Sequence, residues 1–192
     1  MTDVASLDPK KLAKLEQLLD RQDILDCLVR FCRAMDRFDR ELFLSAFHRD
    51  AIIAAGPFVG GPETLYDWAS ELHRQGQSST LHYLLNHTCE IDGDVAHCES
   101  YVIGLFLNND GKTGRLIAGR YIDRLERRDG AWKIALRRST VEVLMTGDAS
   151  ILSSPIFTKL GYVKGTRDKR DASYQRPLTL DETADRWDVQ QS

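Results

Sequence analysis

Asp36 is the first residue whose position suggests chemistry, because it lies near the C-terminal end of an apolar helical segment. The apolar residues of this segment recur at the spacing of one helix face: Ile24, Cys27, Leu28, Phe31, Cys32 and Met35. At about 100° per residue, Asp36 projects within about 40° of Leu25 and Val29, beside the inner face. The helix dipole disfavours a carboxylate there, and burial makes it costly. A partner or a catalytic role explains this position, and an acid exposed to water is the alternative.

The second candidate is His82, in a segment whose alternating pattern predicts a strand over residues 80–91. On a regular strand, two sets of side chains take opposite faces. One set is Leu81, Tyr83, Leu85, His87 and Cys89, and the other is His82, Leu84, Asn86, Thr88 and Glu90. Alternation alone does not say which set faces the interior. A catalytic histidine and one with a structural role both fit this pattern.

The cysteines and histidines do not predict a metal site. The four cysteines have no CxxC spacing, and the five histidines have neither HxxxH nor HExxH spacing on a helix. His82 and His87 are five residues apart, so a regular strand places them on opposite faces. Cys27 and Cys32 fit buried small hydrophobic residues. We therefore expect no metal ion, no disulfide framework and no cofactor.

The N-terminal part predicts two helices. Asp8 followed by Pro9 is a typical helix start, and this helix either continues past Asp20 or restarts there. Asp39 stands where a second short helix over residues 41–48 would begin. An N-cap role explains that acid completely, which separates it from Asp36.

A third helix is expected to begin at Pro62, after the turn-rich loop 56–61. The loop and this helix would form a natural wall of a pocket. Trp68 on the helix is either a core residue or a contact to a ligand. His73 near the end of the helix is expected to be a solvated cap that interacts favourably with the dipole.

Four long strands follow, joined by Asn/Asp-Gly turns that are typical of hairpins. They are expected over residues 80–91, 95–107, 115–127 and 131–145, with a short strand before them over 51–55. Such a meander is antiparallel, and long sheets twist and curve. The expected fold class is therefore α+β: a cone-shaped, curved antiparallel sheet covered by N-terminal helices, with an internal cavity.

Arg137 and Arg138 are adjacent in the last of these strands, so one of them must point towards the pocket side. A charge on a concave, desolvated face needs a partner. We expect that partner to be a carboxylate or an anionic group of a substrate.

The 192 residues suit one domain over 1–147, with an extra N-terminal helix over 9–19 and a C-terminal extension over 148–192. The extension has apolar anchors and is expected to pack on the domain or on a neighbouring subunit. The net charge of −3 does not favour nucleic acid, and no apolar run is long enough for a membrane span. The N-terminus has no signal-peptide pattern, so a cytoplasmic location is expected.

Three local patterns resemble the SnoaL-like branch of the NTF2-like superfamily, over roughly residues 15–147. They are the helix end 35–39 (MDRFD), the strand segment 81–86 (LHYLLN) and the hairpin 121–134. The first two look like those of hexachlorocyclohexane dehydrochlorinase, scytalone dehydratase and bile-acid 7α-dehydratase. In such enzymes an Asp–His pair performs elimination without a cofactor. By position, this resemblance implies Asp36 and His82 as the pair and Arg137 as a substrate-side residue.

The chain departs from several of these enzymes at Phe31, where they have Tyr or Lys five residues before the Asp. A phenol, if needed, must come from elsewhere, with Tyr66, Tyr83 or Tyr101 as candidates. Phe31 indicates an apolar pocket for an aromatic or polycyclic substrate. The expected substrate-binding residues are Arg137, Tyr83, Trp68, Phe31 and Tyr101.

The resemblance predicts a cofactor-independent lyase that releases water, halide or a small aldehyde such as formaldehyde. It also implies a homotrimer. Two alternatives stay open. One is a non-catalytic β-type subunit of a ring-hydroxylating dioxygenase, which does not need an inward Asp–His pair. The other is a SnoaL-like cyclase or isomerase with the same acid–base logic.

Overall fold

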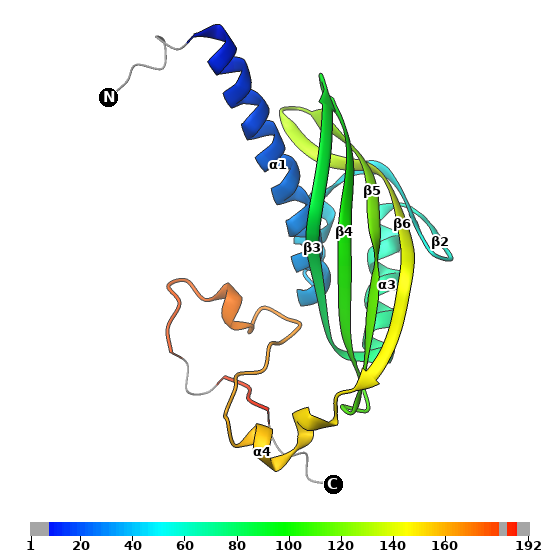
Figure 1. Cartoon of the computed structure of the whole chain (residues 1–192), viewed down its shortest axis with the longest axis vertical. Helices are drawn as coiled ribbons and strands as arrows, with labels where there is room; N and C mark the ends of the chain where they lie inside the picture. Colours follow the sequence, from blue (N-terminus) through cyan, green and yellow to red (C-terminus); the bar gives the residue numbers. More distant parts are fainter. Residues whose placement is uncertain (1–7, 181–183, 188–192) are drawn as a thin grey trace.

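The chain is built on one curved sheet with helices against one of its faces, as the computed structural model shows for residues 8–180 and 184–187 (Figure 1). The helices are α1 (Pro9–Arg37), α2 (Arg40–Ser45), α3 (Pro62–Gly76) and α4 (Pro155–Thr158), with short 3-10 helices at Ser150–Ser153 and Ala172–Tyr174. The strands are β1 (Phe47–Ala55), β2 (Phe58–Gly60), β3 (Gln77–Asp92), β4 (Val95–Asn108), β5 (Thr113–Arg128) and β6 (Ala131–Asp148).

The six strands lie in the order β2-β1-β6-β5-β4-β3. The expected antiparallel meander is present in β3 to β6, while β1 pairs parallel with β6 and antiparallel with β2. Phe47 already pairs with Ile134, so the second helix ends at Ser45, earlier than its pattern suggested. Because β2 and β3 are free edges, the sheet is open. The predicted α+β class, with a curved sheet and N-terminal helices, is confirmed.

Helix α1 is a single helix of 29 residues that starts at the Asp8 cap, so it does not restart at Asp20 and residues 9–19 are its first part. Asp20 instead accepts hydrogen bonds of 2.8 Å from the Trp132 indole and from Arg127. From Ile24 to Asp36 the helix packs one face into the core. No helix in the described residues is long and apolar enough to span a membrane.

Two irregularities decide which side chains of the sheet face the helices. Between Leu84 and His87, β3 has one residue more than the facing part of β4. Such a bulge reverses the alternation, so His82 and His87 both lie on the inner face. The expectation that they take opposite faces was wrong for this reason. A second register shift, beside Ile134 in β6, puts Arg137 on the inner face and leaves Arg138 exposed.

Arg137 is the largest fully buried side chain, with 1% of its surface exposed, and it is paired with Asp123 of β5. Its Nε and Nη2 donate to the two carboxylate oxygens at 2.7 and 2.8 Å. The guanidinium carbon lies 4.2 Å from the ring centre of Phe31 and 4.0 Å from that of Tyr121. Burial alone would lower the pKa of Arg137, but the Asp123 carboxylate raises it, so the guanidinium stays charged.

The C-terminal extension lies against the end of α1 in the described residues. Asp171 pairs with Arg37 at 3.3 Å, and Ser173 accepts a hydrogen bond of 3.1 Å from Arg33. Asp39 accepts hydrogen bonds from Lys169 and from Tyr174. Asp39 does cap α2 as predicted, because its side chain accepts a hydrogen bond from the N–H of Leu42. It also binds the extension, which the sequence did not predict. These contacts hold the extension to the domain of the same chain.

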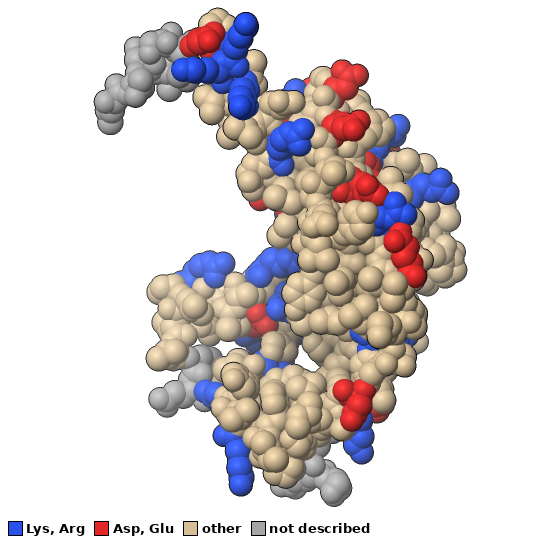
Figure 2. Space-filling view, in the orientation of Figure 1, with Lys and Arg blue, Asp and Glu red and all other residues tan. Residues whose placement is uncertain are grey.

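The outer face of the sheet, away from the helices, exposes apolar side chains. They include Leu81, Tyr83, Leu85, Tyr101, Leu105, Val143 and Met145. Figure 2 shows a broad area with few charged side chains over the middle of the molecule. At one end of the sheet, residues such as Leu105, Leu116 and Leu152 line a pocket of about 490 Å³.

Replacing Arg137 by Met should destabilise the protein by about 3–5 kcal/mol, because it leaves the Asp123 carboxylate buried without a counter-charge. The double variant Arg137→Met/Asp123→Leu should be less destabilised than Arg137→Met alone. Urea unfolding measures both. The control Arg120→Gln, which removes an exposed ion pair with Glu99 and Glu142, should change stability far less. Equal losses in Arg137→Met and Arg120→Gln would contradict this account.

The contact between the extension and α1 should weaken in acid. Burial alone would raise the pKa values of Asp39 and Asp171, but hydrogen bonds lower both below the usual range. Because the pKa is lower in the folded state, the stabilisation is fully present above the ordinary carboxyl pKa of about 4. It is lost as the pH falls through the lower pKa of the folded state. Hydrogen exchange should show residues 164–176 losing protection in acid before β3–β6 do. Asp39→Asn/Asp171→Asn should show that loss at neutral pH, and unchanged protection in this variant would contradict the prediction.

Candidate active site

The structure brings the two predicted catalytic residues, Asp36 and His82, into direct contact. One carboxylate oxygen of Asp36 lies 2.7 Å from Nδ1 of the His82 ring. The other accepts a hydrogen bond of 2.8 Å from the backbone N–H of His82. The side chains of His82 and Asp36 are only 12% and 10% exposed. The end of α1 and strand β3 are therefore joined by one buried carboxylate that binds a single residue twice.

This geometry fixes the chemistry of the imidazole. An ionised carboxylate only accepts hydrogen bonds, so a neutral His82 ring has its proton on Nδ1 and its lone pair on Nε2. Among the described residues, no group forms a hydrogen bond with Nε2. His82 is consequently oriented by Asp36, and its Nε2 has no partner within the described part of the chain.

A second histidine, His73 of α3, lies beside this ring and was expected to be a solvated cap. It is partly buried instead, with its ring centre 5.9 Å from that of His82. Its Nδ1 lies 3.0 Å from the amide oxygen of Gln77. Burial lowers the pKa of His73 and favours the neutral ring. The sequence could have indicated this contact between His73 and Gln77, because residues four apart at a helix end lie next to each other.

Phe106 packs against both histidine rings, with ring-centre distances of 5.5 Å to each. Gly104, which pairs with His82 across the sheet, makes room for it. A Cβ on Gly104 would lie 2.5 Å from two ring carbons of Phe106. The absence of a side chain at residue 104 therefore lets an apolar ring take the space beside the candidate base.

Phe31, Cys32 and Tyr121 form an apolar layer behind the Asp36–His82 pair. Phe31 is 7% exposed and meets Tyr121 edge to face at 5.6 Å. Burial raises the pKa of the Cys32 thiol to about 12. Burial also raises the pKa of Tyr121, whose phenol feels the charges of both Arg137 and Asp36. Phe31, which was predicted to bind substrate, packs against Phe43, Phe47, Tyr121 and Arg137.

Tyr121 is a candidate that the sequence analysis missed. Its segment was treated as a hairpin common to the fold and not as part of the site. Tyr121, Asp123 and Leu125 alternate as inward residues of β5, with Asp123 and Leu125 2% and 0% exposed. That alternation is visible in the sequence and could have found it.

Three of the residues predicted to bind substrate lie elsewhere in this chain. Tyr83 and Tyr101 are on the outer face of the sheet, 45% and 46% exposed, because they alternate with inward-facing neighbours. Trp68 is 37% exposed and stacks on Phe58 of β2 at 5.3 Å. The alternative phenol Tyr66 donates its hydrogen bond to the carbonyl of Phe38. These placements correct the expected pocket lining.

Arg137 does face inward, as one of the two arginines was expected to, and its partner is the carboxylate of Asp123. Its Nη1 remains buried without a hydrogen-bond partner among the described residues. An unsatisfied cationic donor inside a protein is costly, so this nitrogen is suited to an oxygen or halogen atom of a bound molecule.

Comparison with known proteins agrees with the fold. A family model described as the SnoaL-like domain matches residues 16–138. A crystal structure of hexachlorocyclohexane dehydrochlorinase (LinA) type 2 has 25% identity and a TM-score of 0.65, covering 70% of this chain and 93% of that one. A second LinA structure has 27% identity and a TM-score of 0.64, covering 69% and 92%.

A putative scytalone dehydratase from Novosphingobium aromaticivorans has 18% identity and a TM-score of 0.61, covering 67% of this chain and 88% of that chain. This likeness shows the fold alone. No curated protein sequence matches the chain. Because the family model spans well over half of the 192 residues, the chain belongs to the SnoaL-like family of the NTF2-like superfamily.

Proposed function

We propose that this protein is a cofactor-independent lyase that eliminates a small leaving group from a hydrophobic, cyclic substrate. His82 is the general base, and Asp36 holds it. The observation that carries the proposal is the pair of hydrogen bonds that the Asp36 carboxylate accepts from the backbone N–H and the ring of His82. A histidine fixed in this way, with one nitrogen free, is suited to removing a proton from carbon.

In the proposed step, Nε2 of His82 takes a proton from the substrate carbon next to the one that bears the leaving group. The electrons of that C–H bond form the new double bond, and the leaving group departs with its bonding electrons. Asp36 stabilises the imidazolium that results, without itself taking the proton. Loss of the proton to the departing group or to water restores His82.

Two further side chains have proposed roles around the reacting atoms. The free Nη1 of Arg137 would stabilise the negative charge that develops on the leaving group. The Tyr121 phenol would donate a hydrogen bond to the substrate, since its raised pKa keeps it protonated. Phe31 gives this region an apolar wall and supports an aromatic or polycyclic substrate.

The names of the neighbouring structures support elimination chemistry, since they include dehydrochlorinases. We propose halide or water as the leaving group of this step. Release of a small aldehyde such as formaldehyde would take a different step, in which His82 removes the proton of a substrate hydroxyl and the electrons of the broken C–C bond stay with the remaining substrate. The inward Asp36–His82 pair favours a lyase over a non-catalytic partner subunit, which has no need of it. A cyclase or isomerase would use the same pair, and product analysis separates these reactions from elimination.

We also propose that the chain forms a homo-oligomer, a trimer by family resemblance, in the cytoplasm. The exposed apolar side chains of the outer sheet face support this part of the proposal, because apolar surface of this kind favours association. Tyr83 and Tyr101 would then belong to the subunit contact.

His82→Ala and Asp36→Asn should each lower turnover by at least about 10² while the fold is kept. The reason is that the first removes the base and the second removes the carboxylate that fixes its tautomer. The assay measures halide release from hexachlorocyclohexane and dehydration of hydroxylated cyclic compounds, with circular dichroism as the check on folding. The matched control is His97→Ala, which changes an exposed histidine of β4. Turnover near that of the wild type in either site variant would remove the proposal.

Tyr121→Phe should lower turnover by about tenfold or more and change substrate affinity less, because it removes one hydrogen-bond donor and keeps the ring. Tyr101→Phe is its matched control, since that phenol lies on the outer face of the neighbouring strand. Steady-state kinetics on the best substrate of the panel measure both. If the two variants behave alike, Tyr121 has no part in the reaction.

A further inference from the structure

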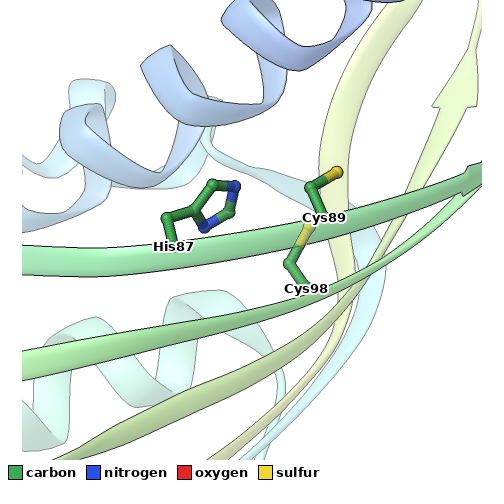
Figure 3. A group of neighbouring side chains, drawn as sticks. All are labelled: His87, Cys89 and Cys98. Atoms are coloured by element: carbon green, nitrogen blue, oxygen red, sulfur yellow. The ribbon is translucent and has the colours of Figure 1, made fainter.

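A second cluster of reactive side chains lies on the inner face of the sheet, formed by His87 and Cys89 of β3 and Cys98 of β4 (Figure 3). Cys89 and Cys98 are directly opposite each other in the strand ladder. The ligand atoms of the three residues all lie within 4.8 Å of one another. The bulge before His87 creates this cluster, because it turns His87 and Cys89 towards the helices.

The His87 ring is oriented by a buried neighbour. Its Nδ1 lies 2.9 Å from the hydroxyl oxygen of Ser100, which is fully buried. Its Nε2 is buried and has no hydrogen-bond partner among the described residues. A buried ring nitrogen without a partner is unfavourable, whereas a histidine held at one nitrogen and free at the other is the usual state of a metal ligand.

Cys89 and Cys98 are both buried, and their sulfur atoms lie close to each other and to the His87 ring. Thiolates are strong ligands for borderline cations such as Zn²⁺, whereas two neighbouring thiolates without a cation repel each other. A cation bound between the two sulfur atoms would therefore be stabilised by both.

We propose that His87, Cys89 and Cys98 bind one Zn²⁺ ion. Thiolate and imidazole ligands together suit Zn²⁺, with bonds of about 2.3 Å to sulfur and about 2.0 Å to nitrogen. Ligand atoms around such an ion are roughly 3.5–3.8 Å apart. In the structure the three ligand atoms lie within 4.8 Å of one another. Side-chain shifts of about 1 Å would therefore bring them to the distances found around Zn²⁺. Two thiolates also neutralise the ion.

None of the three ligands belongs to the Asp36–His82 pair, although Cys98 lies opposite Asp123, the partner of Arg137, in the strand ladder. Cys89 is seven residues along β3 from His82, which is roughly 20 Å in a strand. The ion would join β3 to β4 beneath α1, next to the buried core residues Ala96 and Leu125. No metal ion was expected from the sequence, partly because a regular strand places His82 and His87 on opposite faces.

The experiment uses the full chain, freed of metal with a chelator under a reductant and then titrated with Zn²⁺. Calorimetry and elemental analysis should find one Zn²⁺ per chain. The ion should protect two thiols, Cys89 and Cys98, from alkylation and raise the unfolding temperature. Titration with Cd²⁺ should produce the ultraviolet absorption of thiolate–metal charge transfer. These readouts need no variant and do not depend on catalytic activity.

The variants Cys89→Ser, Cys98→Ser and His87→Ala should each lose stoichiometric binding. Ser100→Ala leaves all three ligands in place and should weaken binding roughly ten- to a hundredfold, because the His87 ring loses its support. Cys27→Ser is the matched control: it changes another buried thiol, whose Sγ lies 3.2 Å from the carbonyl of Ala46, and should bind Zn²⁺ like the wild type.

Either of two results would overturn the proposal. One is that the reduced wild-type chain takes up no Zn²⁺, including the case in which Cys89 and Cys98 are found only as a disulfide. The other is uptake that persists unchanged in the three ligand variants. Since neither result involves turnover, the metal site and the proposed lyase activity fail or stand separately.

Discussion

The Asp36 carboxylate is the constraint on which the rest of this structure depends. A charged group taken out of water is costly unless its oxygens are satisfied, and here both are bound to one residue, His82. The backbone hydrogen bond sets the position of β3 against α1, and the ring hydrogen bond sets the orientation of the imidazole. The same two contacts therefore position the strand and prepare the base.

A second buried charge pair, Arg137–Asp123 of β6 and β5, lies on the same inner face of the sheet. Its guanidinium lies between the rings of Phe31 and Tyr121, so the apolar layer behind the site is built around a cation. Four of the five side-chain nitrogen and oxygen atoms of the pair are hydrogen-bonded within it, and Nη1 of Arg137 is the remaining donor. A buried donor without a partner, on the same inner face as an oriented histidine, favours a functional site in this part of the molecule.

The sequence was informative where the chain is regular. The helical period runs without interruption from Ile24 to Asp36, so the inward position of Asp36 could be predicted. The Asn/Asp-Gly turns likewise predicted the meander. The sheet faces could not be predicted in the same way, because an extra residue in β3 and another in β6 reverse the alternation. Those bulges decide that His87 and Arg137 face the helices, and hydrophobic alternation does not reveal them.

The central claim is that Asp36 fixes the His82 ring with its proton on Nδ1 and leaves Nε2 free to act as a base. Nitrogen-15 NMR of the imidazole measures this directly, because protonated and unprotonated ring nitrogens have different shifts and couplings. The account predicts one hydrogen-bonded proton on Nδ1 of His82, a bare Nε2, and loss of this preference in Asp36→Asn. A proton on Nε2 in the wild type, or the same tautomer in both proteins, would contradict it.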